Sequence, residues 1–263
     1  HDFKKTDDGE SSNIQKLFDV CKYVKRQMRP WIRINRLVRD IPTNVYVRAG
    51  LKMANAGQII DKELAEKEGI ICKNIRAHEV GRNEIADNVY EVIRVYEGSH
   101  GIDYFISIED TEENIYTIVD ENEYKIYGFI RLRLSYTPGA GFMLCLKNSA
   151  LIRELHIYGQ VTPVWMKGTK HIQHRGLGSR LIKMSEEIAI MHGYTKMSII
   201  AGVGVKEYYR NKHDYVNVGT YVSKQLLINV DVDLSTLDNW KEQQWAIVRD
   251  AGYPIYIKPD IDP

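Results

Sequence analysis

Three strand-like segments in the middle of the chain, at 89–98, 103–110 and 123–135, constrain the fold more than any other feature. Each segment is rich in Val, Ile, Tyr and Phe, which favour β-strands, and polar breaks at 98–101 and 120–123 separate them. Short connections of this kind join neighbouring strands in antiparallel order. The segments therefore predict an antiparallel meander.

Two glycines stand where a further predicted strand, at 150–159, leads through a loop into a helix. The helix is indicated by apolar residues at helical spacing, namely Leu177, Leu181, Met184 and Ile188. At its start, Gly176 and Gly178 would let backbone N–H groups approach a phosphate closely, and the helix dipole favours negative charge there. A tight turn into the helix is the alternative. NAD binding is disfavoured, because the G-x-G-x-x-G pattern lacks its third glycine here and the preceding strands look antiparallel.

The N-terminal part is expected to begin with a disordered segment at 1–13, which is polar and short of residues to bury. Apolar residues at helical spacing predict a helix over 14–28 that Pro30 ends. Alternation predicts a strand over 31–38, and Gly69 is expected to end a second helix.

Beyond the helix that follows the glycine pair, the chain is expected to form three more elements before its tail. These are a short strand over 196–204, a short helix over 205–212 and a final strand over 215–226. The tail, 227–263, is interpreted as an appended strand–helix–strand element.

The nearly neutral net charge of +1 hides a basic run near the N-terminus. The run contains no acidic residue, and its cations are Lys22, Lys25, Arg26, Arg29, Arg33, Arg36 and Arg39. Tyr23 and Trp31 lie among them. Cations that bind phosphates and flat rings that stack on bases are typical of nucleic-acid surfaces. A solvated helix face is the alternative.

The three cysteines, at 21, 72 and 145, are too widely spaced to form a compact zinc or iron–sulfur motif. We therefore expect no metal site. Such sparse cysteines suit a reducing compartment, and we expect the protein to be cytoplasmic. No apolar run is long enough to predict a membrane span.

The segment QHRGLG, at 173–178, fits the Q/R-x-x-G-x-G/A loop that binds the pyrophosphate of acetyl-CoA in Gcn5-related acetyltransferases. Together with it, residues 151–164 and 199–215 closely resemble the acetyltransferase domain of the catalytic subunit of Elongator. Upstream, 29–42 resembles a motif near the end of that family's radical S-adenosylmethionine domain, and 72–81 resembles the junction between the two domains.

The resemblance implies an α+β chain with the Gcn5-related N-acetyltransferase fold, which is a mixed, mostly antiparallel sheet with flanking helices. A remnant of the radical S-adenosylmethionine α/β domain would precede it. We expect the remnant and junction at 14–86, the acetyltransferase domain at 87–226 and a C-terminal extension at 227–263.

The function that the resemblance implies is the use of acetyl-CoA to build a 5-carboxymethyl group on the wobble uridine of tRNA. The family's radical domain, with an iron–sulfur cluster and S-adenosylmethionine, generates a radical on the acetyl group. The basic run would then contact tRNA. Other Elongator-type subunits or further copies of the chain are expected partners, and a membrane is not.

This chain departs from the family's pattern. It lacks the clustered cysteines of the iron–sulfur site, and its start at His1 suggests that the radical domain is omitted. We therefore expect acetyl-CoA binding and hydrolysis, but not the complete uridine modification. At the junction, Cys72 remains, whereas Asn74 and Ala77 stand where other members have cysteine. With His78 alone beside it, Cys72 is not expected to form a zinc site.

The resemblance also implies roles for individual residues. Contacts with the cofactor are expected from Glu154, Leu155, His156, Ile157, Gln173, Gly176, Leu177, Gly178, Ser179 and Tyr209. Backbone groups of the strand at 154–157 would polarise the thioester carbonyl, unless this is an ordinary core strand. Glu154 and His156 are candidate bases. Tyr209 would protonate the departing thiolate, whereas Tyr208, which points about 100° away on a helix, would pack or meet the substrate.

Two other functions remain open. The first is a protein lysine acetyltransferase, which would need a base facing an open peptide groove. The second is a non-catalytic tRNA-binding module in which the acetyltransferase fold has become structural.

Overall fold

The computed structural model describes residues 12–35, 37, 55–81, 89–110, 124–158, 176–226, 246–250 and 253–258. The chain divides into two compact units, which are described separately below. The smaller unit is His1–Glu79 with Asp120–Glu123, and the larger is Val80–Val119 with Tyr124–Pro263.

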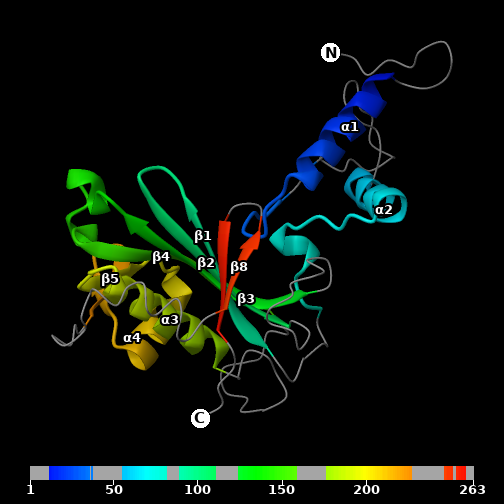
Figure 1. Ribbon diagram of the computed structural model, residues 1–263. Coiled ribbons are helices and arrows are strands. Elements are labelled where there is room, and N and C mark those ends of the chain that lie inside the picture. Colours follow the sequence, from blue (N-terminus) through cyan, green and yellow to red (C-terminus); the bar gives the residue numbers. More distant parts are fainter. Residues whose placement is uncertain are drawn as a thin grey trace. The chain divides into compact units, whose positions relative to one another are not determined.

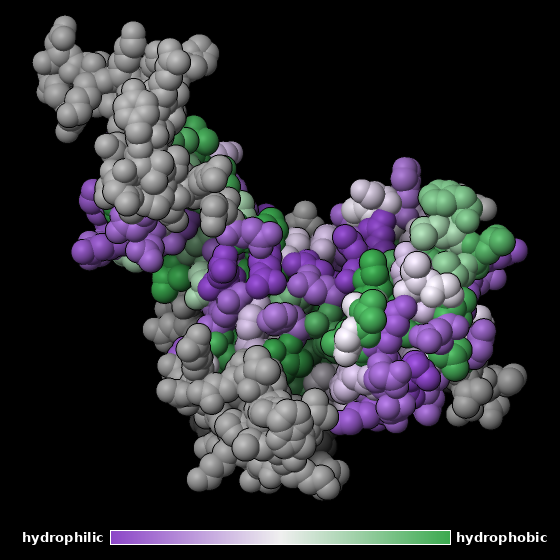
Figure 2. Space-filling model, turned by 180° about the vertical axis from the view of Figure 1, so that it is seen from behind, coloured by the Kyte–Doolittle hydropathy of each residue, from purple (hydrophilic) through white to green (hydrophobic). Residues whose placement is uncertain are grey.

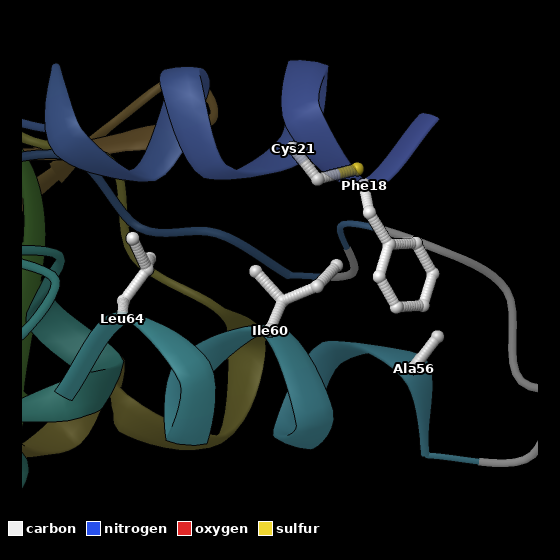
Figure 3. Close-up of a cluster of buried hydrophobic side chains, with 5 residues drawn as sticks. All are labelled: Phe18, Cys21, Ala56, Ile60 and Leu64. Atoms are coloured by element: carbon white, nitrogen blue, oxygen red, sulfur yellow. The ribbon is translucent and has the colours of Figure 1, made fainter. Parts of the chain in front are cut away.

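The smaller unit is built on two helices, α1 (Ser12–Arg26) and α2 (Ala56–Glu68). Their apolar faces meet in a cluster of buried side chains, drawn in Figure 3, that comprises Phe18, Cys21, Ala56, Ile60 and Leu64. Gly69 ends α2 in the left-handed conformation, φ 64°, as its sequence predicts. The helix predicted at 14–28 exists, but it begins at Ser12, inside the segment expected to be disordered, and ends at Arg26.

The strand predicted over 31–38 is wrong for its described part, because residues 31–35 and 37 form turns and irregular structure. Ile32 accepts one backbone hydrogen bond, 3.0 Å long, from Ile75, which begins the short 3₁₀ helix η1 (Ile75–Ala77). A strand needs a repeating ladder of such bonds with a neighbour. The alternating residues here have no such neighbour within the described ranges.

The larger unit is a nine-stranded sheet in the order β6-β7-β5-β4-β3-β2-β1-β9-β8 (Figure 1). The strands of this sheet are β1 (Tyr90–Glu97), β2 (Gly101–Asp110), β3 (Lys125–Ser135), β4 (Ser149–Ile157), β5 (Lys196–Ile199), β6 (Val216–Val218), β7 (Tyr221–Gln225), β8 (Ala246–Asp250) and β9 (Tyr253–Lys258). Strands β1 to β3 form the predicted antiparallel meander, and β4, which was predicted as a further strand, pairs antiparallel with β3. Only β4 and β5 pair in parallel among the described strands.

Two elements near the end of the chain differ from their predictions. The single strand expected over 215–226 is a hairpin of β6 and β7, because Gly219 takes φ 62° and reverses the chain. In the tail, the described residues form the hairpin of β8 and β9, and β9 pairs with β1. The remainder of the predicted strand–helix–strand element lies outside the described residues.

Helix α3 (Leu177–Met191) packs on the sheet and is followed, after β5 and the 3₁₀ helix η5 (Val203–Val205), by α4 (Lys206–His213). Two polar contacts fix α3 at its ends. Arg180 donates from Nε to Glu91 of β1 over 2.8 Å, and the hydroxyl of Tyr104 in β2 lies 2.6 Å from Nε2 of His192. These contacts hold both ends of α3 against the sheet.

A buried ion pair joins β1 to β2. Arg94 donates two hydrogen bonds to Glu109, 2.5 and 3.1 Å long, and Ser107 donates to the same carboxylate. Removing one partner of such a pair leaves a buried charge, which typically costs about 3–5 kcal/mol. The pair therefore makes this part of the sheet intolerant of single substitutions.

The predicted α+β class with a mixed, mostly antiparallel sheet and flanking helices is confirmed. The origin of the smaller unit as a radical S-adenosylmethionine remnant stays a prediction, as do the proposed domain boundaries. Within the described residues, no helix has the length and apolar character required to span a membrane.

Candidate functional site

The parallel pair β4 and β5 separates part-way along its length. The ladder runs from Ser149 opposite Lys196 to Ile152 opposite Ile199, and the amide of Ile200 donates to the carbonyl of Ile152 over 3.1 Å. Strand β5 then ends, whereas β4 continues to Ile157 with β3 on its other side. Among the described residues, the second half of β4 therefore has no strand ladder on its β5 side, and we call this stretch of β4 the opening.

The connection from β5 to α4 gives this opening an apolar margin. Ile200, Val203 and Val205 are exposed, Val203 to 89%. Figure 2 shows hydrophobic surface between hydrophilic side chains on one face of the protein. An exposed apolar margin next to open strand ends is suited to the uncharged chain of a ligand.

Helix α3 begins at Gly176, which is its N-cap and takes the left-handed conformation, φ 74°. The first intrahelical bond joins the amide of Arg180 to the carbonyl of Gly176 over 3.0 Å. The amides of Leu177, Gly178 and Ser179 therefore belong to the first turn, where N–H groups have no acceptor inside the helix. They and the helix dipole favour an anion at this end.

Gly178 is needed for a different reason from Gly176. A Cβ atom at position 178 would lie 2.9 Å from the hydroxyl oxygen of Tyr208, 3.7 Å from Ile157 and 3.9 Å from Leu155, whereas at 176 nothing lies within 4 Å. The first turn of α3, the end of β4 and α4 therefore converge at Gly178. A side chain at position 178 would therefore displace the Tyr208 hydroxyl.

The two adjacent tyrosines of α4 occupy different environments. Tyr208 directs its hydroxyl to Gly178, but Tyr209 is buried and packs edge-on against Tyr215 with ring centroids 6.2 Å apart. Burial, with a contribution from Tyr208, raises the pKa of Tyr209 to about 12. The cofactor contact assigned to Tyr209 from the sequence stays a prediction, and the structure places the Tyr208 hydroxyl at the glycine turn.

The four predicted strand residues divide between the two faces of the sheet. Leu155 and Ile157 lie near Gly178, on the α3 face. Glu154 and His156 alternate with them and point to the opposite face, because successive side chains of a strand alternate. There Glu154 accepts a hydrogen bond from Nε of Arg131 over 3.0 Å, and His156 packs against Tyr158 with centroids 4.5 Å apart. The structure thus separates the two candidate bases from the first turn of α3. Gln173 lies outside the described residues.

No family model matches this chain. It is 36% identical to a tRNA uridine(34) acetyltransferase of Methanocaldococcus jannaschii, in an alignment that covers 81% of this chain and 38% of that protein. It is 33% identical to Elongator complex protein 3 of Schizosaccharomyces pombe, with 80% of this chain and 37% of that protein covered. The chain is a homologue of these proteins.

The chain spans less than two fifths of the length of the two relatives named above. Among solved structures, Tetrahymena Gcn5 matches with 14% identity and a TM-score of 0.29, over 49% of this chain and 71% of that chain. A likeness of that size supports no argument about this chain. The homology with the tRNA uridine(34) acetyltransferases and Elongator complex protein 3 is therefore the informative comparison.

Four cations of the basic run, which the sequence assigned to tRNA contacts, form ion pairs with carboxylates in this chain. The ion pairs are Lys22–Glu63, Lys25–Asp61, Arg26–Glu68 and Arg33–Glu79. Hydrogen bonds from Lys22 and Arg26 hold the pKa of Glu63 and of Glu68 below the usual value. The sequence did indicate this pairing, because residues 61–68 form an acidic segment that can neutralise the basic run. The prediction of tRNA contacts did not take this segment into account. Arg36 and Arg39 lie outside the described residues.

The cysteines do not form a ligand set. Cys21 is buried in the helix pair, Cys145 lies in the short 3₁₀ helix η3 (Leu144–Leu146), and Cys72 accepts a hydrogen bond from Asn74 over 3.0 Å. In the described ranges, no three His, Cys, Asp or Glu residues are grouped so that they could hold a metal ion. The described residues therefore do not fit an iron–sulfur cluster or a junction zinc ion.

Proposed function

We propose that this chain is the acetyl-CoA-binding part of an acyltransferase that modifies the wobble uridine of tRNA. Two of its homologues are named tRNA uridine(34) acetyltransferase and Elongator complex protein 3. The observation that most supports the proposal is the meeting of the α3 N-terminus, the opening between β4 and β5 and the Tyr208 hydroxyl at Gly178.

The binding residues follow from this arrangement. Backbone amides of Leu177, Gly178 and Ser179 donate to the pyrophosphate, and Gly176 supplies the left-handed N-cap that precedes them. The backbone of β4 from Glu154 to Ile157 runs beside the pantetheine arm, with the apolar β5–α4 connection opposite. Gln173, which lies outside the described residues, stays a cofactor contact predicted from the sequence alone.

Acetyl-CoA supplies an activated acetyl group as a thioester. In hydrolysis, water adds its oxygen to the carbonyl carbon, the carbon–sulfur bond breaks, and the sulfur takes a proton. The hydroxyl of Tyr208 is the nearer donor, because it faces the glycine turn while Tyr209 is buried and its raised pKa keeps it a poor acid. Glu154 and His156 would act as bases only on a substrate that reaches the opposite face of the sheet.

The tRNA would lie over the smaller unit and compete there with the carboxylates of α2 for the cations of the basic run. Further Elongator-type subunits or a second copy of the chain are partners in this proposal. The radical steps that the family's resemblance implies, with an iron–sulfur cluster and S-adenosylmethionine, are not assigned to residues of this chain.

The test is the release of free thiol from acetyl-CoA, with and without added tRNA. We expect tRNA to stimulate the wild-type rate and Gly178→Glu to abolish it, since a side chain at 178 collides with Tyr208 and brings a negative charge to the pyrophosphate site. Gly81→Glu is the matched control, because position 81 is exposed and nothing lies within 4 Å of its Cβ position.

Two results would contradict the proposal. If the wild-type chain binds tRNA but not acetyl-CoA, the chain is a tRNA-binding scaffold. If Gly178→Glu hydrolyses acetyl-CoA at the wild-type rate, the first turn of α3 is not the binding site.

A further inference from the structure

A histidine at the end of α4 contacts both elements that meet at the glycine turn. Nε2 of His213 lies 3.4 Å from the hydroxyl oxygen of Ser179, in the first turn of α3. The His213 ring also packs edge-on against the Tyr208 ring, with centroids 5.1 Å apart and an interplanar angle of 64°. Tyr208 in turn directs its hydroxyl to Gly178, one residue before Ser179.

We propose that His213 is a positioning residue that holds the Tyr208 hydroxyl and the first turn of α3 in one fixed arrangement for acetyl-CoA. This inference rests on the proposed function. Among the described residues, Tyr208 also makes ring contacts with Tyr209 and with Lys212, whose ammonium lies 5.7 Å from the Tyr208 ring centroid, but neither contact reaches the first turn of α3. A hydroxyl displaced by about 1 Å can lose much of its effect on a reaction.

The surroundings of His213 favour its neutral form. Burial lowers the pKa of the imidazole, Lys224 of β7 and Lys212 of α4 lower it further, and Glu186 of α3 and Asp214 oppose them. A neutral imidazole has one donor and one acceptor nitrogen, so it can pair with the Ser179 hydroxyl in either sense. A proton added to His213 would place a cation beside two lysines and the positive end of the α3 dipole. Protonation should therefore loosen the contact.

The experiment compares acetyl-CoA hydrolysis in wild type, His213→Leu and His213→Asn. We expect His213→Leu to lower kcat about tenfold, with a smaller change in the affinity for coenzyme A, because the backbone amides of α3 remain. His213→Asn keeps a hydrogen-bonding group and should recover much of the rate. Asn211→Leu, on an exposed position of the same helix, is the matched control.

The pH profile separates positioning from simple packing. The wild-type rate should fall as the pH drops below 6.5, and this acidic limb should disappear in His213→Asn, which cannot take up the proton. Thermal unfolding of each variant identifies any loss of activity that comes from misfolding. Coenzyme A binding by wild type tests the proposed function separately, since its absence would overturn that function. Normal binding with an unchanged rate and pH profile in a folded His213→Leu would overturn this inference alone.

Discussion

At the scale of single residues, neighbours of the same type have different physical tasks. Gly176 is required by its left-handed backbone and Gly178 by the space that Tyr208 occupies. Tyr208 faces the turn, whereas Tyr209 belongs to the core. The sequence motif indicated that both glycines and both tyrosines matter. It could not assign them, because the direction of each side chain depends on how α4 packs against α3 and β7.

Tyr209 should make stability depend on pH in the alkaline range. Its folded pKa of about 12 lies above the ordinary tyrosine value of 10.0, so the folded protein favours the protonated phenol. The stabilisation is complete below pH 10 and is lost as the pH rises from 10 to 12, with an upper limit of about 2–3 kcal/mol.

The measurement is urea unfolding of wild type and Tyr209→Phe between pH 9 and pH 12. The free energy of unfolding of wild type should fall more steeply than that of the variant, in which Tyr215 still titrates. Tyr136→Phe, at an exposed phenol, is the control. Parallel curves for wild type and Tyr209→Phe would show that burial of this phenol has no linkage to stability.

At the scale of elements, the sequence predicts what local pattern determines and misses what distant partners determine. The meander and α3 were predicted, because alternation and helical spacing extend over many residues there. The strand predicted at 31–38 was wrong and the paired state of the basic run was missed, because each depends on a segment tens of residues away. The β6–β7 hairpin was missed because Gly219 alone marks its turn.

The pairing between α1 and α2 predicts that removal of an acid strengthens tRNA binding. Glu68→Gln frees Arg26, so affinity for tRNA should rise and the dependence of log affinity on log salt should steepen by about 1. Stability should change little, since this is a surface pair whose side chains are 34% and 31% exposed. Fluorescence anisotropy of labelled tRNA over a salt series measures both quantities.

Glu66→Gln is the matched control for that experiment. It removes the same charge from the same helix, but Glu66 pairs with Lys62 inside α2 rather than with the basic run. If the two variants have equal affinities for tRNA and equal slopes of log affinity against log salt, then Arg26 does not contact tRNA. The basic run is then better interpreted as a solvated helix face.

At the scale of the whole molecule, the β8–β9 hairpin determines how the sheet ends. It pairs with β1 from Glu91 opposite Lys258 to Arg94 opposite Ile255, so β1 is an interior strand of the sheet. The opposite edge is β6, which has three residues. An exposed strand edge is a template for pairing with other chains, and very short edge strands reduce that hazard.

Deletion of residues 246–263 should therefore increase self-association. The backbone groups of the eight-residue strand β1 would be exposed along one edge. Sedimentation velocity at several concentrations should show larger species than the full chain forms, and a synthetic peptide of residues 246–263 should reduce them. Identical sedimentation of the two chains at all concentrations would mean that β1 is protected by another segment.

The same pairing fixes an order of events during synthesis. Strand β1 is made first in the larger unit, and its partner β9 leaves the ribosome after every other described strand. The meander and α3 can fold before β9 pairs with β1, because the residues they bring together are closer in sequence than β1 and β9 are. Until the hairpin docks, nascent chains on one messenger RNA present identical open edges to one another. Slow translation of the tail would prolong that exposure, so the codons of residues 227–258 are a point at which the yield of folded protein can be controlled.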